Sequence, residues 1–346
     1  MIPPVPDFGF GPAPEPGRVD VVAPGVRRLT APNPGLMTGP GTNTYLLGEA
    51  EPVVVDPGPA DEGHTAAIAA AAASLGPIRH ILVTHTHVDH APGAAALAAA
   101  SGARVIGFGS AEGLYPDQRV HDGWSLTIPG PGAGCLTVRA LHTPGHASDH
   151  LCWLVEEHAL LLTGDHVMHG STVVIRPPDG DLHQYLASLA RVREADPPIR
   201  TLAPGHGRLM DHVAEVIDAL VAHRLGRHER VMAVLTRRGD GTVDELLLEV
   251  YGDVTERQLP VARFSLWAHL RALAQEGRVT PVGAPGPAGV TEVRRADGAD
   301  DDADTADDDA DTADDADTAD DAATADDAAT ADDVEDTMES RWVVAT

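Results

Sequence analysis

Seven histidine and aspartate residues of this chain stand at spacings that favour metal binding. Four of them lie within six residues, in the segment HTHVDH at 85–90, one residue after the apolar run ILV at 81–83. The other three follow short apolar segments and stand next to a glycine: His146 in TPGH, Asp165 in TGD and His206 in APGH. A buried strand fixes the position of its end, the loop beyond it turns side chains into a cleft, and glycine permits close backbone approach. We therefore expect the seven side chains to meet.

The residue types indicate which metal would bind and what it would do. Imidazole nitrogens and carboxylate oxygens suit zinc, with bonds of roughly 2.0–2.2 Å, and a four-coordinate ion cannot use seven ligands. The set therefore predicts two Zn²⁺ ions per chain that share a bridging ligand. Two cations would lower the pKa of a shared water from about 15.7 towards 7 and so provide hydroxide at neutral pH. The sequence thus predicts a hydrolase.

At these residues the chain resembles the metallo-β-lactamase superfamily, whose pattern is H-x-H-x-D-H followed by a distant His, Asp and His. The resemblance implies that Asp89 and Asp165 hold the attacking hydroxide, and that Asp56, in VVVDPG, lies beside the metals without binding them. It implies one metal on His85, His87 and His146, a second on Asp89, His90 and His206, and Asp165 as the bridge between them.

Further candidate site residues lie close to these motifs. His150 and His166 are near the ligands in the sequence, where we expect side chains that orient the ligands. His166 and His169 are also candidate proton donors to the leaving group. Thr42 and Asn43, in the segment GTNTY, are candidates for hydrogen bonds to the substrate, with a structural role in a turn as the alternative.

The surrounding pattern predicts an α/β domain over residues 18–222, preceded by a flexible leader at 1–17 that is rich in proline and glycine. The resemblance implies that the domain is a four-layer αββα sandwich. Strands are expected at 53–55, 81–83, 104–107, 136–141, 151–155 and 159–163, and alanine-rich helices at about 64–75 and 92–101.

Residues 223–283 resemble a winged helix. Apolar residues at helical spacing predict helices at about 213–221 and 227–238, and TVDE at 242–245 has the form of a capping box. A longer helix then carries Phe264 and Trp267, and a strand follows at 278–282. Nine arginines against eight acidic residues between 224 and 280 give no basic stripe for DNA binding.

This module makes the chain similar to the beta-lactamase-like protein 2 family. The similarity includes NPG at 33–35, GTNTYL at 41–46 and PPDG at 177–180, and it runs from about residue 20 to 283. It implies cleavage of single-stranded RNA, because members with known activity cut it. Hydroxyacylglutathione hydrolases share the whole metal motif, so a thioesterase acting on a small-molecule ester or thioester is the alternative. A nucleic-acid-binding regulator without catalysis is disfavoured by the complete ligand set.

Charge and composition limit the remaining possibilities. All 24 basic residues are arginine, which excludes a Schiff-base or P-loop lysine. Residues 297–346 contain 21 acidic residues and one arginine, so they account for −20 of the net charge of −29 and leave −9 elsewhere. We expect residues 284–346 to be a disordered acidic tail. Deletion of residues 297–346 should leave folding and metal content unchanged, because we expect this tail to bury nothing. No apolar stretch approaches the roughly 20 residues of a membrane span and no signal peptide is evident, so a cytoplasmic location is expected.

Overall fold

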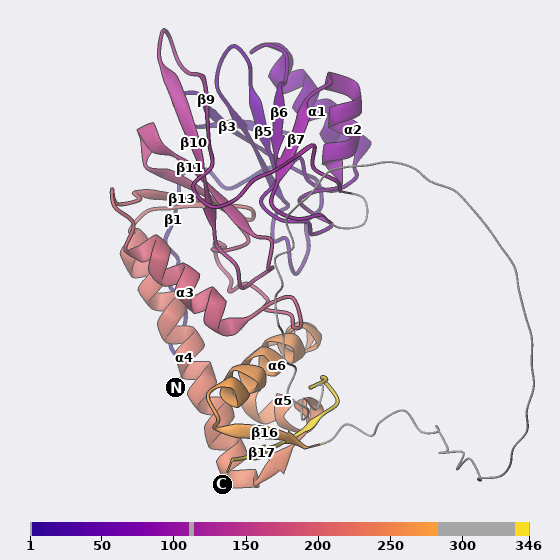
Figure 1. The fold of residues 1–346 in the computed structure, drawn as a ribbon, viewed down its shortest axis with the longest axis vertical. Helices are drawn as coiled ribbons and strands as arrows, with labels where there is room; N and C mark the ends of the chain where they lie inside the picture. Colours follow the sequence, from indigo (N-terminus) through magenta and orange to yellow (C-terminus); the bar gives the residue numbers. More distant parts are fainter. Residues whose placement is uncertain (1, 111–113, 283–335, 346) are drawn as a thin grey trace, which may run out of the picture.

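The computed structural model describes residues 2–110, 114–282 and 336–345. A larger part contains two sheets flanked by helices, and a smaller, mainly helical part lies at one end, with the long helix α4 (Val213–Arg238) running along both (Figure 1). Among the described residues, no helix combines the length and the apolar character that crossing a membrane requires.

The first sheet has the strand order β2-β3-β4-β5-β6-β7-β8. The strands from β5 to β8 are parallel, and helices α1 and α2 cover the outer face, where Ile68 and Leu97 pack against Ile81. Its elements are β2 (Val19–Ala23), β3 (Val26–Thr30), β4 (Asn43–Leu47), β5 (Val53–Val55), α1 (Glu62–Ala73), β6 (His80–Leu82), α2 (Gly93–Ser101), β7 (Arg104–Gly107) and β8 (Gln118–Arg119).

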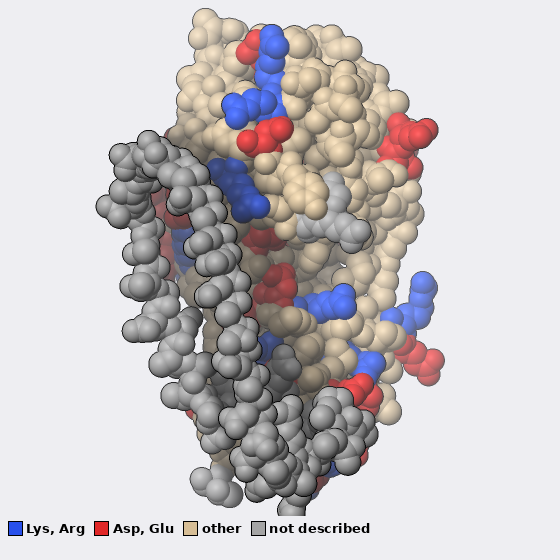
Figure 2. Space-filling model, turned by 45° about the vertical axis from the view of Figure 1, so that its right-hand side comes forward, with Lys and Arg blue, Asp and Glu red and all other residues tan. Residues whose placement is uncertain are grey.

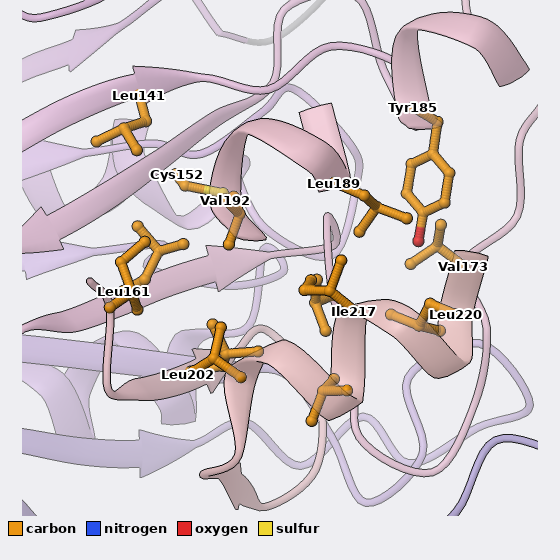
Figure 3. Close-up of a cluster of buried hydrophobic side chains, with 14 of the residues drawn as sticks. Leu141, Cys152, Leu161, Val173, Tyr185, Leu189, Val192, Leu202, Ile217 and Leu220 are labelled. Atoms are coloured by element: carbon orange, nitrogen blue, oxygen red, sulfur yellow. The ribbon is translucent and has the colours of Figure 1, made fainter. Parts of the chain in front are cut away.

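The second sheet has the order β1-β14-β13-β12-β11-β10-β9, and its outer face is covered by α3 and the first half of α4. Figure 3 shows Leu189 and Ile217 of these helices facing the sheet residues Leu161 and Leu202. Its elements are β1 (Gly9–Phe10), β9 (Ser125–Pro129), β10 (Cys135–His142), β11 (Leu151–Val155), the 3-10 turn η1 (Glu156–His158), β12 (Leu160–Gly164), α3 (Leu182–Arg193), β13 (Thr201–Pro204) and β14 (Leu209–Met210).

The two sheets face each other across a second apolar core. Tyr45 and Leu82 of the first sheet pack in one cluster with Trp153 and Leu162 of the second. Helix layer, sheet, sheet and helix layer therefore follow one another, and the αββα sandwich expected from the sequence is confirmed. The paired inner faces bring the ends of β6, β10, β12 and β13 to the same edge, which carries the candidate ligands.

The smaller part is the expected winged helix. Thr242 and Glu245 form the capping box that begins α5. The second half of α4 contributes Val231 and Leu235 to its core, together with Leu266 of α6. Its other elements are β15 (Asp240–Gly241), α5 (Val243–Tyr251), the 3-10 turn η2 (Glu256–Gln258), α6 (Leu259–Gln275), β16 (Val279–Val282) and β17 (Arg341–Val344).

Helix α4 differs from the two separate helices expected at 213–221 and 227–238. It continues without a break through residues 222 and 223, where the sequence placed a domain boundary. One glycine, Gly226, costs only about 1 kcal/mol in a helix. Packing on both sides outweighs that cost, because Leu220 belongs to the core of the sandwich and Val231 to the core of the winged helix.

Part of the segment at 1–17, expected to be a flexible leader from its proline and glycine content, contacts the second sheet. Gly9 and Phe10 pair with Met210 and Leu209 at the edge of the second sheet, and Phe8 packs against the core beneath it. The unpaired edge of β14 offers backbone groups that this segment satisfies.

The expectation of a disordered tail at 284–346 concerns mostly residues outside the described part of the chain. Its last section is different: β17 lies between β15 and β16 and completes the sheet of the winged helix. Trp342 is fully buried there, and Arg341 forms ion pairs with Asp240 and Glu245. The expectation that this tail buries nothing was therefore wrong, because the adjacent acidic repeats concealed an apolar strand at 341–344.

Candidate metal centre

The structure brings all seven candidate ligands together at one edge of the sandwich. Each follows the end of a strand: the HTHVDH segment follows β6, His146 follows β10, Asp165 follows β12 and His206 follows β13. Side-chain atoms that can bind a metal lie within 4.8 Å of one another in two groups. The groups are His85, His87 and His146, and Asp89, His90, Asp165 and His206.

In the first group three imidazole nitrogens converge. Nε2 of His85 lies 2.9 Å from Nδ1 of His87, and Nε2 of His146 lies 3.0 Å from the same atom. His85 and His146 are buried, whereas His87 is exposed at the mouth of the site. Three nitrogens on one side and solvent on the other is the arrangement of a metal site with an open coordination position.

In the second group two imidazoles face two carboxylates. Nε2 of His206 lies 3.2 Å from Oδ2 of Asp89 and 3.2 Å from Oδ1 of Asp165. Nε2 of His90 lies 3.3 Å from Oδ1 of Asp165 and 3.3 Å from Nε2 of His206. Nitrogen and oxygen atoms of this kind and number can hold one divalent cation.

Asp165 faces both groups. Its Oδ1 points at His90 and His206, while its Oδ2 lies 3.6 Å from Nε2 of His146 in the first group. Oδ1 is buried and makes no hydrogen bond within the described residues beyond these two imidazole contacts. A buried carboxylate needs positive charge beside it, so the site fits a metal on this side.

Two glycines are needed for this close packing. A Cβ atom at Gly205 would lie 2.6 Å from Cε1 of His90 and 3.0 Å from Oδ1 of Asp165. At Gly164, where φ is +46°, a Cβ would lie 2.7 Å from the hydroxyl of Thr84. The glycines next to the ligands thus permit the approach that the sequence predicted.

Hydrogen bonds on the outer ring nitrogens orient four of the histidines. Nδ1 of His90 lies 2.8 Å from Oδ2 of Asp56, and Nδ1 of His146 lies 2.6 Å from the carbonyl of Val174. The other two contacts are His85 Nδ1 to Thr84 Oγ1 at 3.0 Å and His206 Nδ1 to the Gly41 carbonyl at 3.3 Å. In each ring the outward Nδ1 is bonded, so Nε2 is the nitrogen that faces the centre.

Asp56, at the end of β5 in the first sheet, contacts both His90 and the segment that precedes His85. Its carboxylate accepts hydrogen bonds from the backbone N–H of Thr84 at 2.7 Å and from the Thr84 hydroxyl at 2.8 Å, as well as from His90. Asp56 is buried and has a φ of +50°, an uncommon backbone conformation for a residue with a side chain. Asp56 therefore positions the HTHVDH loop through Thr84 and His90, and it is not a member of either group of candidate ligands.

The two groups differ in charge. Burial lowers the pKa of His85 well below its usual value and that of His146 to about 4, so both rings are neutral and can bind a metal. Burial alone would raise the pKa of Asp165, but the neighbouring His206 and His90 hold it well below its usual range. Burial would likewise lower the pKa of His206, yet Asp165 raises it to about 9. The second group therefore presents anionic carboxylates to a cation.

Comparison with known proteins agrees with this geometry. Residues 37–206 match the family model of the metallo-beta-lactamase superfamily, and residues 242–286 match that of the beta-lactamase associated winged helix domain. An atrochrysone carboxyl ACP thioesterase of Aspergillus fumigatus is 32% identical over 260 residues, which are 69% of this chain and 78% of the relative. The chain belongs to the metallo-beta-lactamase superfamily.

Two further relatives support the assignment to this superfamily. A beta-lactamase-like protein 2 homologue of Caenorhabditis elegans is 31% identical over 245 residues, which cover 68% of this chain and 79% of the relative. A metallo-beta-lactamase family protein of Thermus thermophilus, whose crystal structure is known, is 25% identical. It superposes with a TM-score of 0.63 over 76% of this chain and 97% of that one.

Within this superfamily fold, Thr42 and Asn43 have the structural surroundings that the sequence allowed as the alternative to substrate binding. Both side chains are fully buried. Asn43 Nδ2 donates to the carbonyls of Pro204 and Gly207 at 2.9 and 3.0 Å, and the Thr42 backbone pairs with His206. These two residues hold the loop that carries His206.

The two candidate proton donors lie in different surroundings. His166 is fully buried, and burial lowers its pKa to about 3, so its ring is neutral at neutral pH. Nε2 of His169 lies 2.7 Å from Oδ1 of Asp7 in the N-terminal segment. His150 orients a ligand loop, because its Nε2 accepts a hydrogen bond from the Asp165 N–H at 3.1 Å.

A cleft joins the metal centre of this metallo-beta-lactamase domain to the winged helix. It encloses about 110 Å³ and has His146 and Asp165 at one end. No arginine is among the described residues that line it. The other lining residues are Leu36, Met37, Met168, Ser171, Thr172, Val173, Val174, Tyr251, Gln258, Val261, Ala262 and Ser265.

Sequence reasoning missed Thr84 and the cleft residues of the winged helix. Thr84 stands between the strand and His85, and only its contact with the distant Asp56 reveals its role. Gln258, Val261, Ala262 and Ser265 share one helical face, a signal present in the sequence. Only the folded structure shows that this helical face lines the cleft beside the candidate metal ligands.

Proposed function

We propose that this protein is a dinuclear zinc hydrolase that cleaves thioesters with an apolar acyl group. The observation that carries the proposal is the cleft between the metal centre and the winged helix. Apolar side chains form most of its lining, and no arginine is among them. Such a surface gains free energy by burying hydrocarbon, roughly 0.8 kcal/mol per methylene group, and its described lining has no arginine to pair with the phosphates of a polyanion.

The seven ligands would hold the two ions, with Asp165 shared between them, which the distances from its two oxygens to the two groups support. Two bound cations would activate a water at neutral pH and polarise the substrate carbonyl. Asp89 and Asp165, both anionic, would orient that water, and the exposed His87 lies at the side from which substrate enters.

The choice of leaving group also favours a thioester. His166 is fully buried, His169 contacts Asp7, and neither lines the cleft, which favours a substrate whose leaving group needs no proton donor. A thiol has a pKa of about 8.5, so a thiolate leaves without prior protonation. The similarity to a fungal ACP thioesterase at 32% identity supports the same chemistry.

Cleavage of single-stranded RNA is the second candidate. The similarity to a beta-lactamase-like protein 2 homologue and the attached winged helix favour it. Charge opposes it, because the chain outside residues 297–346 carries a net −9 and arginines are interspersed with acidic residues on the face in Figure 2. A non-catalytic nucleic-acid regulator is opposed by α6, the helix that would enter a DNA groove, because its Ala268 and Ala272 are buried against the sandwich.

A direct comparison of substrates tests the proposal. The zinc-loaded protein would be assayed with acetyl, butanoyl, hexanoyl and octanoyl thioesters of N-acetylcysteamine, with S-lactoylglutathione and with a labelled RNA 20-mer. We expect kcat/KM to be highest for a longer acyl thioester.

His87→Ala is the control for a contaminating enzyme, because it removes an exposed ligand with little effect on packing. His121→Ala, an exposed histidine outside the site, is its matched reference. RNA cleavage that depends on His87, with every thioester left intact, would overturn the proposal in favour of the nuclease.

A further inference from the structure

The face of α6 that carries Val261, Ala262 and Ser265 forms one wall of the cleft. Together with Gln258, these positions follow the i, i+3, i+4, i+7 spacing of a single helical face. In a winged helix bound to DNA the corresponding helix reads the groove. In this protein the same helix lines the cleft to which His146 and Asp165 also contribute.

The opposite wall is connected to the metal centre itself. Val173 and Val174 line the cleft, and the Val174 carbonyl lies 2.6 Å from Nδ1 of His146. A group held between Val174 and Val261 therefore lies beside a ligand of the first metal group. Leu36 and Met37, whose side chains remain 47% and 45% exposed, stand at the cleft as further apolar contacts.

Helix α6 is fixed in position, because it is packed on both sides. Leu266 and Leu270 lie in the core of the winged helix, whereas Ala268 and Ala272 lie in the core beneath α3. Glu276, which follows α6, accepts a hydrogen bond from His183 of α3 at 3.0 Å.

A second contact crosses the same junction. The guanidinium of Arg176 lies over the ring of Phe264, 4.7 Å from its centre. The wall thus has a fixed distance from the metal centre.

We infer that the α6 face sets the length of the acyl group that the enzyme accepts, with Val261 as the main determinant. This inference rests on the proposed thioesterase function. The cleft is lined by His146 and Asp165 as well as by the α6 face, so an acyl chain that enters beside the metal ligands meets this wall. A rigid wall of this kind discriminates about 10- to 200-fold for each methylene group that does not fit.

Two substitutions of Val261 in the full chain test the inference. Val261→Trp fills the cleft, so we expect the ratio of kcat/KM for the octanoyl over the acetyl thioester to fall at least about 10-fold. Val261→Ala enlarges the cleft and should shift the preferred chain to a longer one. Leu248→Trp is the matched control, because Leu248 lies on α5, is 66% exposed and does not line the cleft.

A binding measurement separates this inference from the proposed function. S-octyl-N-acetylcysteamine, a thioether that cannot be hydrolysed, would be titrated into each zinc-loaded variant by calorimetry. We expect binding to the wild type and the Leu248→Trp control, and at least about 10-fold weaker binding to Val261→Trp.

The outcomes are distinct. Thioester hydrolysis with the same chain-length ratio in Val261→Trp and wild type would overturn the inference and leave the function standing. Thioether binding that depends on Val261, without hydrolysis of any thioester, would overturn the function and leave the wall as a binding surface for alkyl chains. Neither hydrolysis nor binding in the wild type would overturn both.

Discussion

Trp342 lies opposite Pro281 in the antiparallel ladder of β16 and β17, and its side chain is fully buried in the core of the winged helix. The two strands are separated in sequence by the acidic repeats. Residues 341–344, which the composition assigned to a solvated tail, therefore complete the sheet of the winged helix. Helix α6 of the same domain lines the cleft.

Replacement of Trp342 by alanine should lower the free energy of unfolding by about 3–5 kcal/mol, because it leaves a cavity in a packed core. Urea denaturation measures the change. Trp342→Phe should cost less than about 1.5 kcal/mol, since it keeps an aromatic ring and removes a buried N–H that has no hydrogen-bond partner among the described residues.

A second comparison measures separately how the strand β17 and the acidic repeats contribute to stability. Replacing residues 286–333 with an uncharged glycine-serine linker keeps β16 and β17 and should leave stability unchanged, whereas truncation after 335 should destabilise the winged helix. Equal stability of the truncated and full chains would contradict the role of β17.

Metal content should be two zinc ions per chain in protein prepared without chelator, as measured by elemental analysis. His87→Ala should lower this number and reduce kcat/KM more than about 100-fold, because loss of an orienting partner alone typically costs 10- to 100-fold. His121→Ala should match the wild type in both measurements. A full complement of metal in His87→Ala would remove His87 from the ligand set.

Asp56→Asn should weaken metal binding about 10- to 100-fold, because an amide cannot accept the three hydrogen bonds that Thr84 and His90 donate. Competition with a chelator measures this change. Asp61→Asn, which also replaces a carboxylate by an amide, should have little effect, because Asp61 caps α1 and asparagine caps helices equally well. Similar metal affinities for both variants would contradict the orienting role of Asp56.

Stability should decrease as the pH falls from about 6.5 to 4, partly because of His64. Its side chain is buried against the Thr44 hydroxyl at 2.8 Å, and burial lowers its pKa to about 4. Since the pKa in the folded state lies below that of the unfolded state, protons bind the unfolded chain first in this interval.

The variant His64→Gln keeps a side-chain N–H that can donate a hydrogen bond to the Thr44 hydroxyl. It removes the imidazole that gains a proton in this pH range. The wild-type protein should therefore lose on the order of 2–3 kcal/mol more stability than this variant between pH 6.5 and 4. Urea unfolding at a series of pH values measures the difference. Parallel stability curves for the two proteins would show that His64 is protonated equally in both states.

Local pattern in the sequence determined most of the sandwich and the identity of the candidate ligands. Strand ends and glycines place His85, His146 and His206 at one edge, because a strand end and a tight turn depend on only a few neighbouring residues. The capping box at Thr242 was predictable for the same reason. The order of the ligands along the chain was enough to recognise the superfamily.

Tertiary packing decided the rest. Asn43 and His166 are polar and stand beside motifs, but contacts with distant segments bury both and exclude them from the cleft. The local sequence does not identify what Val261 and Trp342 contact, because their roles depend on surfaces that meet only in the folded chain. Periodicity shows that a residue has a buried side, whereas only the three-dimensional structure shows which surface covers it.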